Sequence, residues 1–220
     1  LGLSGIFETP KDQKPKMDFH YDMKEIMYEE IFKALESFRK LAPLAEYVNG
    51  KFNLDLEFSG LVNDDLSLDL NSIQANGFLN TLNASIESFP ALKTLSSKFD
   101  LGKIENGYQL KNTKNWLEIR EGKVVIEEFV RQIGGLEYRI EGSHGIDQMI
   151  DYQIRTSIPK DKLKGTGIDR GMDLVVDQAN QLGLKLDQAD YVDVQFDLKG
   201  KFSDPKLGFK VLGVSSGDGS

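Results

Sequence analysis

The sequence predicts an α+β fold: a curved, mainly antiparallel, amphipathic β-sheet, shaped as a half-barrel or groove, with two longer helices and one short helix packed on it. Two observations predict the sheet: runs of strict apolar–polar alternation recur along the chain, and residues typical of turns separate them. Strict alternation gives a strand one apolar and one polar face, which suits an antiparallel sheet with one solvated side. A third observation predicts the helices: in a few segments the apolar residues recur at helical spacing instead of alternating.

Alternation is clearest between residues 123 and 159. Two alternating runs flank the connection Gly142-Ser143-His144-Gly145. Their apolar members are Leu136, Tyr138 and Ile140 before it and Ile150, Tyr152 and Ile154 after it. Two such runs predict an antiparallel hairpin with one face on a core or on an apolar ligand. A shorter hairpin precedes it, with Glu121-Gly122 as the turn between Trp116–Ile119 and Val124–Ile126.

The N-terminal part of the chain changes its period once. We expect residues 1–16 to form an incoming linker or strand, because prolines and charged residues near its end discourage regular structure. Alternation then predicts a strand over Met17–Met23, and helical spacing predicts a helix over Lys24–Ala42. Pro43 closes that helix, because the residue before a proline avoids the α region.

Alternation returns in the middle of the chain. It predicts strands over Phe52–Phe58 and Leu66–Leu70, joined by a loop over residues 62–65. It also predicts a pair of short strands over Ile73–Ile86, with Gly77 breaking the run.

Two further helices and two strands complete the prediction. Pro90 opens a short helix, and Gly183 caps a second long helix. The apolar residues of these helices are Leu92, Leu95 and Phe99, and Met172, Val175, Val176, Ala179 and Leu182. The last strands cover Val192–Leu198 and Leu207–Val211, so we place the main domain at residues 17–213 and a disordered tail at residues 214–220.

Composition excludes several classes of function. The net charge of −8 argues against a nucleic-acid partner, because phosphates would repel the chain. The absence of cysteine excludes disulfides, thiolate nucleophiles and cysteine-ligated zinc. No apolar run approaches the roughly 20 residues that span a bilayer. The chain starts with Leu1 and shows no signal peptide, so we expect a piece of a longer protein whose targeting segments lie outside it.

No group of residues has catalytic or metal-binding spacing. His20 falls in a predicted strand and His144 in a predicted turn, so we expect surface or turn roles for both. The chain has no Walker loop and no Gly-x-Ser-x-Gly elbow, and its acidic loops lack the calcium-ligand pattern of an EF-hand. We therefore expect a non-enzymatic protein with no catalytic residue, no cofactor and no bound metal. A hydrolase stays open only if the fold brings distant carboxylates or a Ser/His pair into one pocket.

Several short motifs follow one another in a suggestive order. They are Leu41-Ala42-Pro43-Leu44-Ala45 with Gly50, Leu70-Asn71-Ser72-Ile73-Gln74-Ala75-Asn76-Gly77, Gly142-Ser143-His144-Gly145-Ile146-Asp147-Gln148 with Ile150-Asp151-Tyr152, Ile158-Pro159, and Leu198-Lys199-Gly200-Lys201-Phe202-Ser203-Asp204-Pro205-Lys206. Together they resemble the C-terminal region of AsmA-family proteins, particularly the long AsmA-like proteins of Bacteroidota-type bacteria. The last motif resembles the family's terminal Gly-Thr-x-x-(Asn/Asp)-Pro-Lys pattern, with Lys201 in place of the threonine. The resemblance covers the chain from about Met17 to about Val211.

The resemblance implies a periplasmic protein tethered to the inner membrane by a helix outside this chain. Such a protein acts in outer-membrane assembly and envelope integrity. The family is related to TamB-like and chorein-type bridge proteins, whose amphipathic sheets are thought to carry lipid along a hydrophobic groove. The resemblance therefore implies a membrane lipid, such as a phospholipid, and other envelope proteins as partners, and it supplies no catalytic residues.

The apolar strand faces leave two alternatives open. The candidate lipid-facing residues are Phe52, Leu54, Leu56, Phe58, Leu136, Tyr138, Ile140, Ile150, Tyr152 and Ile154. In the first alternative they line a groove that shields acyl chains. In the second they are an ordinary core, and the chain is a structural cap that docks another envelope protein by adding a strand to its last one. We expect core for most of them, and the test is whether the helix over Lys24–Ala42 fills the face.

Overall fold

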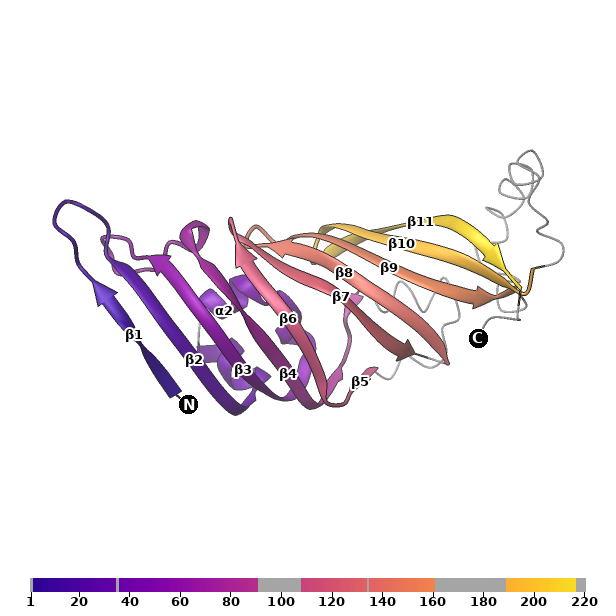
Figure 1. The fold of residues 1–220 in the computed structure, drawn as a ribbon, viewed down its shortest axis with the longest axis horizontal. Helices are drawn as coiled ribbons and strands as arrows, with labels where there is room; N and C mark the ends of the chain where they lie inside the picture. The colour runs from indigo at the N-terminus through magenta and orange to yellow at the C-terminus, as the bar shows by residue number, and fades with distance from the viewer. Residues whose placement is uncertain (1, 35, 91–107, 134, 161–188, 217–220) are drawn as a thin grey trace. The chain divides into compact units, whose positions relative to one another are not determined.

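The computed structural model describes residues 2–34, 36–90, 108–133, 135–160 and 189–216, with the side chains of residues 36–38 left out. The fold is mainly β, an open antiparallel sheet of 11 strands with little helix among the described residues (Figure 1). The strands are β1 Gly2–Glu8, β2 Lys16–Met27, β3 Val48–Leu61, β4 Gln74–Ile86, β5 Tyr108–Leu110, β6 Thr113–Arg120, β7 Lys123–Ile133, β8 Leu136–Gly145, β9 Met149–Pro159, β10 Tyr191–Lys201 and β11 Asp204–Ser215. Their order is β1-β2-β3-β4-β6-β7-β8-β9-β10-β11, and β5 pairs with β4.

The chain divides into two compact units that share three strands. The first unit holds β1 to β6, the start of β7 up to Glu127, and the segment Gly142–Ile150 at the β8–β9 connection. The second unit holds the rest of β7, β8 and β9 together with β10 and β11. We call them unit 1 and unit 2 and describe each by itself.

The prediction of one helix over Lys24–Ala42 is wrong: its first residues belong to a strand, and the rest forms two short helices. Strand β2 continues to Met27, and the helical elements that follow are α1 Tyr28–Ala34, α2 Glu36–Leu41 and the 3-10 turn η1 Pro43–Tyr47. Ile26 pairs with Phe52 of β3 beyond a bulge at which Glu25 takes a φ of 55°. The adjacent apolar residues Ile26 and Met27 are compatible with a strand or a helix, and their pairing with β3 places them in a strand. Helix α2 ends before Pro43, as predicted.

Helix is therefore scarcer than the predicted α+β class requires. Among the described residues α1 is the one helix that reaches 7 residues. The second long helix predicted over residues 172–182 lies outside the described residues, and so does the body of the short helix predicted after Pro90. The sheet alone defines the architecture that the structure describes.

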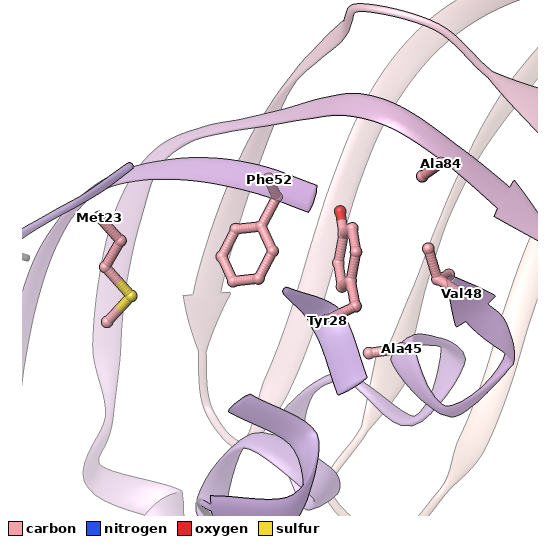
Figure 2. Close-up of a cluster of buried hydrophobic side chains, with 6 residues drawn as sticks. All are labelled: Met23, Tyr28, Ala45, Val48, Phe52 and Ala84. Carbon is pink, nitrogen blue, oxygen red and sulfur yellow. The ribbon is translucent and has the colours of Figure 1, made fainter. Parts of the chain in front are cut away.

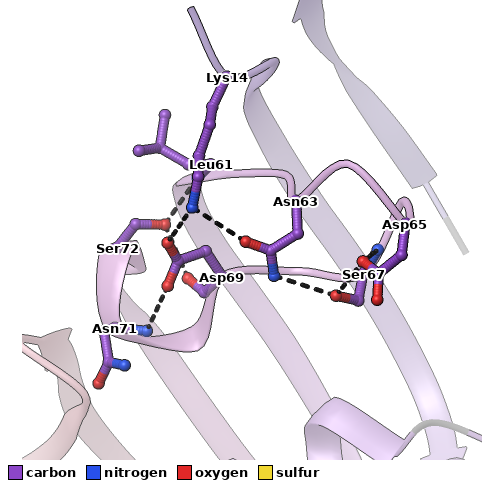
Figure 3. Close-up of polar contacts among 8 residues, drawn as sticks. All are labelled: Lys14, Leu61, Asn63, Asp65, Ser67, Asp69, Asn71 and Ser72. Carbon is purple, nitrogen blue, oxygen red and sulfur yellow. Dashed lines mark hydrogen bonds and ion pairs between the residues drawn. The ribbon is translucent and has the colours of Figure 1, made fainter.

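The loop between β3 and β4 replaces the strand predicted over Leu66–Leu70. Only an isolated bridge joins Val62 to Leu68, and the 3-10 turn η2 Leu70–Ser72 follows. Side chains add to a few backbone hydrogen bonds in this loop (Figure 3): the Asp65 carboxylate accepts from the Ser67 amide at 3.0 Å, and Lys14 donates to both Asn63 and Asp69 at 3.0 Å. Short polar side chains that bond nearby backbone groups compete with strand pairing, so alternation alone misleads here.

Strand β4 runs unbroken through Gly77, where the sequence predicted a break. Gly77 pairs with Leu56 of β3, and a Cβ at this glycine would lie 2.0 Å from the Asp55 carbonyl oxygen. The glycine thus permits a close approach between β3 and β4 within a continuous strand.

Both predicted hairpins are present. In the first, Glu121 and Gly122 have φ of 51° and 69°, as a two-residue type I′ turn requires. In the second, the glycine-rich segment Gly142–Gly145 ends strand β8, and the turn lies at residues 146–148. The Gln148 amide donates to the Gly145 carbonyl at 2.9 Å, and the Met149 amide donates to Asp147 at 3.0 Å.

The ends of the sheet extend further than predicted. Strand β1 occupies much of the stretch expected to be a linker or strand. At the other end, β10 and β11 confirm the two predicted strands, but β11 continues to Ser215 and Val214 pairs with Val192. The predicted tail therefore begins at least two residues too early.

Candidate functional site

Strand register defines one apolar face in unit 1. Directly paired residues of adjacent strands lie on the same face of a sheet. We call the following set the apolar face: Leu3 and Phe7 of β1, Met17, Phe19, Tyr21 and Met23 of β2, Phe52, Leu54, Leu56 and Phe58 of β3, Ala75 and Leu79 of β4, Leu117 and Ile119 of β6, and Val124 of β7. The opposite face is polar over most of β2 and β3. The amphipathic sheet that the sequence predicted is therefore present in unit 1.

Helical residues cover the centre of this sheet around Phe52. Tyr28, at the start of α1, packs against Phe52 with ring centroids 4.5 Å apart and ring planes tilted by 39°, and Ala45 of η1 joins the same cluster (Figure 2). The Tyr28 hydroxyl and Thr81 of β4 share a hydrogen bond of 2.6 Å. Burial raises the pKa of Tyr28 to about 12, although the hydrogen bond to Thr81 acts to lower that pKa. Figure 1 shows the helical segment lying across one face of the neighbouring strands.

A second cluster covers the apolar face beside the first. Leu56 and Phe58 pack with Ile73, which is fully buried, and with Ile119 and Val124. Leu41 from the end of α2 and Leu68 and Leu70 from the β3–β4 loop pack against it. Protein atoms thus fill this part of the face.

His144 joins strand β8 to the end of helix α2. Its side chain is buried in β8, and its Nε2 lies 2.6 Å from the carbonyl oxygen of Leu41 at the end of α2. A carbonyl only accepts, so Nε2 carries the proton. Burial lowers the pKa of His144, and the bond to Leu41 works against that shift. The predicted surface or turn role for His144 is therefore wrong, because the residue belongs to a buried strand end.

The apolar face is uncovered at β1. Leu3 and Phe7 pair with Tyr21 and Met17 and so continue the apolar face, but Leu3 is 57% exposed and Phe7 is 50% exposed. Every residue of β1 is exposed. Sequence reasoning missed these two residues, although Leu3, Gly5 and Phe7 alternate with Ser4 and Ile6, because the prolines and charges that follow indicated a connection.

Unit 2 has an apolar cluster of its own. Val192, Val194 and Phe196 of β10 pack with Ile158 of β9, and all are buried. The partly buried residues around them are Leu136, Ile154, Leu207, Val211 and Val214. Tyr138 is 4% exposed, and its hydroxyl has no hydrogen-bond partner among the described residues. Burial raises the pKa of Tyr138 to about 12 and also raises that of Tyr152.

The ten predicted lipid-facing residues divide between the two units. Phe52, Leu54, Leu56 and Phe58, together with Ile150, belong to unit 1, and Leu136, Tyr138, Ile140, Tyr152 and Ile154 belong to unit 2. The buried ones are Phe52, Leu56, Phe58, Tyr138 and Ile150, and the others are half-buried. None is fully exposed. Five of the ten are therefore core, and a lipid-facing role for the others stays a prediction.

The polar face of unit 1 carries pairs of opposite charges. His20 of β2 is accessible to solvent, and its Nδ1 lies 2.9 Å from the carboxylate of Glu57 on β3. Lys51 bonds Glu25 at 3.0 Å on the same two strands. Within the described ranges no set of three or more histidine and acidic side chains is arranged to hold a metal. No described helix is long and apolar enough to cross a membrane.

Comparison with known proteins found no match for this chain. No family model matches the chain, and no curated protein or solved structure matches it significantly.

Proposed function

We propose that the chain is a non-enzymatic module of an AsmA-family envelope protein and that it handles lipid on the apolar face of its β-sheet. One observation carries the proposal. The apolar face continues beyond its covered centre to Leu3 and Phe7, which are half exposed to solvent beside Met17 and Tyr21. Exposed apolar surface next to a filled core is typical of a binding surface.

The charge of the chain favours acyl chains over a membrane surface as the group bound. With a net charge of −8, the chain gains no attraction to an anionic leaflet. Leu3 and Phe7 offer dispersion contacts and burial of hydrocarbon, the terms that reward contact with an acyl chain. We further propose that the sheet curves into a groove or half-barrel that shields such a chain.

The cellular setting rests on the sequence motifs. Their resemblance to the C-terminal region of AsmA-family proteins supports a periplasmic module, tethered to the inner membrane through a segment outside this chain, that acts in outer-membrane assembly. A phospholipid is the partner that this setting supplies. Other envelope proteins are the second class of partner.

A structural cap without lipid binding is the alternative function. It is favoured by β11, which ends the strand order of the sheet at the opposite side from β1. Strand addition to β11 would hold another envelope protein. Phe209→Pro would then abolish pull-down of that protein, whereas a lipid module would keep its lipid in this variant.

Lipid retention tests the main proposal. Leu54→Asp and Tyr138→Asp are poor tests, because both residues belong to cores and the variants would unfold. The sharper variant is Leu3→Asp/Phe7→Asp on the apolar face. Its matched control is Ser4→Asp/Ile6→Asp on the same strand, which changes the charge equally on the opposite face.

We expect native mass spectrometry of the purified chain to show bound phospholipid, lost in Leu3→Asp/Phe7→Asp and kept in the control. Circular dichroism should show both variants folded. The absence of lipid from the wild-type chain, or equal retention in the two variants, would overturn the proposal.

A further inference from the structure

An aromatic pair lies on the polar face of unit 1, the face opposite the apolar face. Phe78 of β4 pairs directly with Trp116 of β6, and their ring centroids lie 4.8 Å apart at an interplanar angle of 71°. Asp55 of β3 pairs with Phe78 from the other side, so the three side chains share one face. Phe78 is 40% exposed and Trp116 is half-buried. The helical cover packs on the other face, so it does not account for these two rings.

Unused polar groups border the aromatic pair. Asn76 and Asn80 lie two residues before and after Phe78 on β4, and alternation places them on its face. Neither carboxamide, nor the indole N–H of Trp116, makes a hydrogen bond to any residue that the structure describes. A carboxamide donates and accepts, and an indole donates. The surface therefore combines aromatic rings with neutral donors and acceptors that a ligand could use.

The charges around the pair restrict the ligand. The Lys114 Nζ lies 4.0 Å from the centroid of the Phe78 ring, so this ammonium would repel a second cation. Asp55 lies beside Phe78, and Glu118 follows Trp116 by two residues on the same face, so carboxylates would repel an anion such as a phosphate. An acyl chain would desolvate the two carboxamides without offering them hydrogen bonds. A neutral ligand rich in hydroxyl groups meets none of these penalties.

We propose that this surface, which we call the aromatic patch, binds a neutral carbohydrate. A pyranose packs its C–H groups on aromatic rings, and each of its hydroxyls both donates and accepts. Neighbouring strands lie about 4.8 Å apart and alternate residues of a strand about 6.7 Å apart, so Asn76 and Asn80 border a sugar placed on the rings. Lys114 is exposed and flexible, so it moves aside or donates to a hydroxyl. The proposal goes beyond lipid handling, since it concerns the opposite face of the sheet.

Intrinsic fluorescence tests the proposal directly, because Trp116 is the single tryptophan of the chain. The whole chain is titrated with three neutral trisaccharides: maltotriose, cellotriose and chitotriose. We expect a saturable change in tryptophan emission with at least one of them, and titration calorimetry should give the same dissociation constant. No saturable response to any of the three up to their solubility limits would overturn the proposal. A response to tetramethylammonium chloride alone would identify a cation site and overturn it as well.

Two variants that keep the tryptophan locate the binding. Asn76→Ala/Asn80→Ala removes the carboxamides, and Phe78→Leu removes one ring while retaining an apolar side chain. We expect each to raise the dissociation constant for the bound trisaccharide at least about tenfold, through lost hydrogen bonds or lost ring contact. Circular dichroism should show both variants folded. Wild-type affinity in either variant would contradict binding at the aromatic patch.

Gln109→Ala is the matched control. It removes an exposed carboxamide from β5, which pairs with β4 at Ser85 and so lies away from the aromatic patch. We expect its dissociation constant to stay within about twofold of the wild-type value. An equal loss of affinity in the control would show that binding does not depend on the patch. Retention of phospholipid in Phe78→Leu should match the wild-type chain, so the carbohydrate and lipid proposals succeed or fail separately.

Discussion

Two stretches of one apolar face differ in what lies on them. Around Phe52 the side chains of α1 and η1 fill the face, and Phe52 has no exposed surface. At β1 nothing described covers Phe7, which keeps half of its surface in solvent. The same apolar–polar alternation precedes both outcomes. Alternation thus fixes which side of a strand is apolar, whereas the connecting segments decide whether that side becomes core or stays available to a ligand.

Truncating a phenylalanine in each stretch should give the largest contrast. We expect Phe52→Ala to lower the free energy of unfolding by about 3–5 kcal/mol, because it leaves a cavity against Tyr28 and Met23. Phe7→Ala should change it by no more than about 0.5 kcal/mol. Urea unfolding followed by circular dichroism measures both. Similar losses for the two variants would mean that β1 is covered as fully as the centre.

Substitution of two glycines at which an added Cβ would clash compares global with local stability. A Cβ at Gly77 in β4 would meet the Asp55 carbonyl oxygen at 2.0 Å, and one at Gly5 in β1 would meet the Asp18 carbonyl oxygen at 2.1 Å. We expect Gly77→Ala to cost about 1–3 kcal/mol of global stability, since β3 and β4 must separate. Gly5→Ala should instead release β1 alone.

Hydrogen exchange distinguishes these outcomes. In Gly5→Ala the amides of β1 should lose protection while the urea midpoint stays within error of wild type. A lowered midpoint in Gly5→Ala equal to that of Gly77→Ala would show that β1 is an integral part of the unit 1 core.

Much of the sheet was predictable, because strand periodicity and turn chemistry agreed. The strand around Phe52–Phe58, the Glu121-Gly122 turn and the final pair of strands all follow from local sequence. The sequence predictions were wrong where one sequence pattern is compatible with two local structures. Ile26 and Met27 fit a helix or a strand, and the partner β3 decided between them. A lone Gly77 signals either a break or a close approach.

The candidate site was less predictable than the fold. Five of the ten predicted residues are buried. Periodicity does not reveal that Tyr28, Ala45 and Leu41 pack against the members on β3. The exposed residues Leu3 and Phe7 lie in a stretch whose prolines and charges suggested a connection. Their exposure depends on the position of β1 at the sheet edge, which is a property of the whole topology.

Acid should loosen the covered stretch through His144. Its pKa is lowered in the folded protein, so the unfolded chain takes up the proton first as the pH falls. The stabilisation is complete above the ordinary value of 6.5 and declines as the pH drops below it toward the lowered folded value, by at most about 1.4 kcal/mol per pH unit. The bond to Leu41 ties this loss to the end of α2.

His144→Gln tests the acid effect, because an amide can donate to Leu41 without titrating. We expect urea midpoints between about pH 7 and pH 5 to fall less in this variant than in wild type. If His144→Gln keeps the wild-type slope, the acid sensitivity lies elsewhere.

The smallest expected effect concerns two tyrosine hydroxyls with opposite environments. Tyr28→Phe removes the 2.6 Å hydrogen bond to buried Thr81 and should cost about 1 kcal/mol, because Thr81 loses its partner under the helical cover. Tyr138→Phe removes a buried hydroxyl that has no partner among the described residues, so it should leave stability unchanged or raise it by about 1 kcal/mol. Urea unfolding of both variants in one buffer gives the two signs directly. A loss in Tyr138→Phe as large as that in Tyr28→Phe would mean that the Tyr138 hydroxyl is satisfied in solution, and unit 2 would then hold a polar contact inside its core.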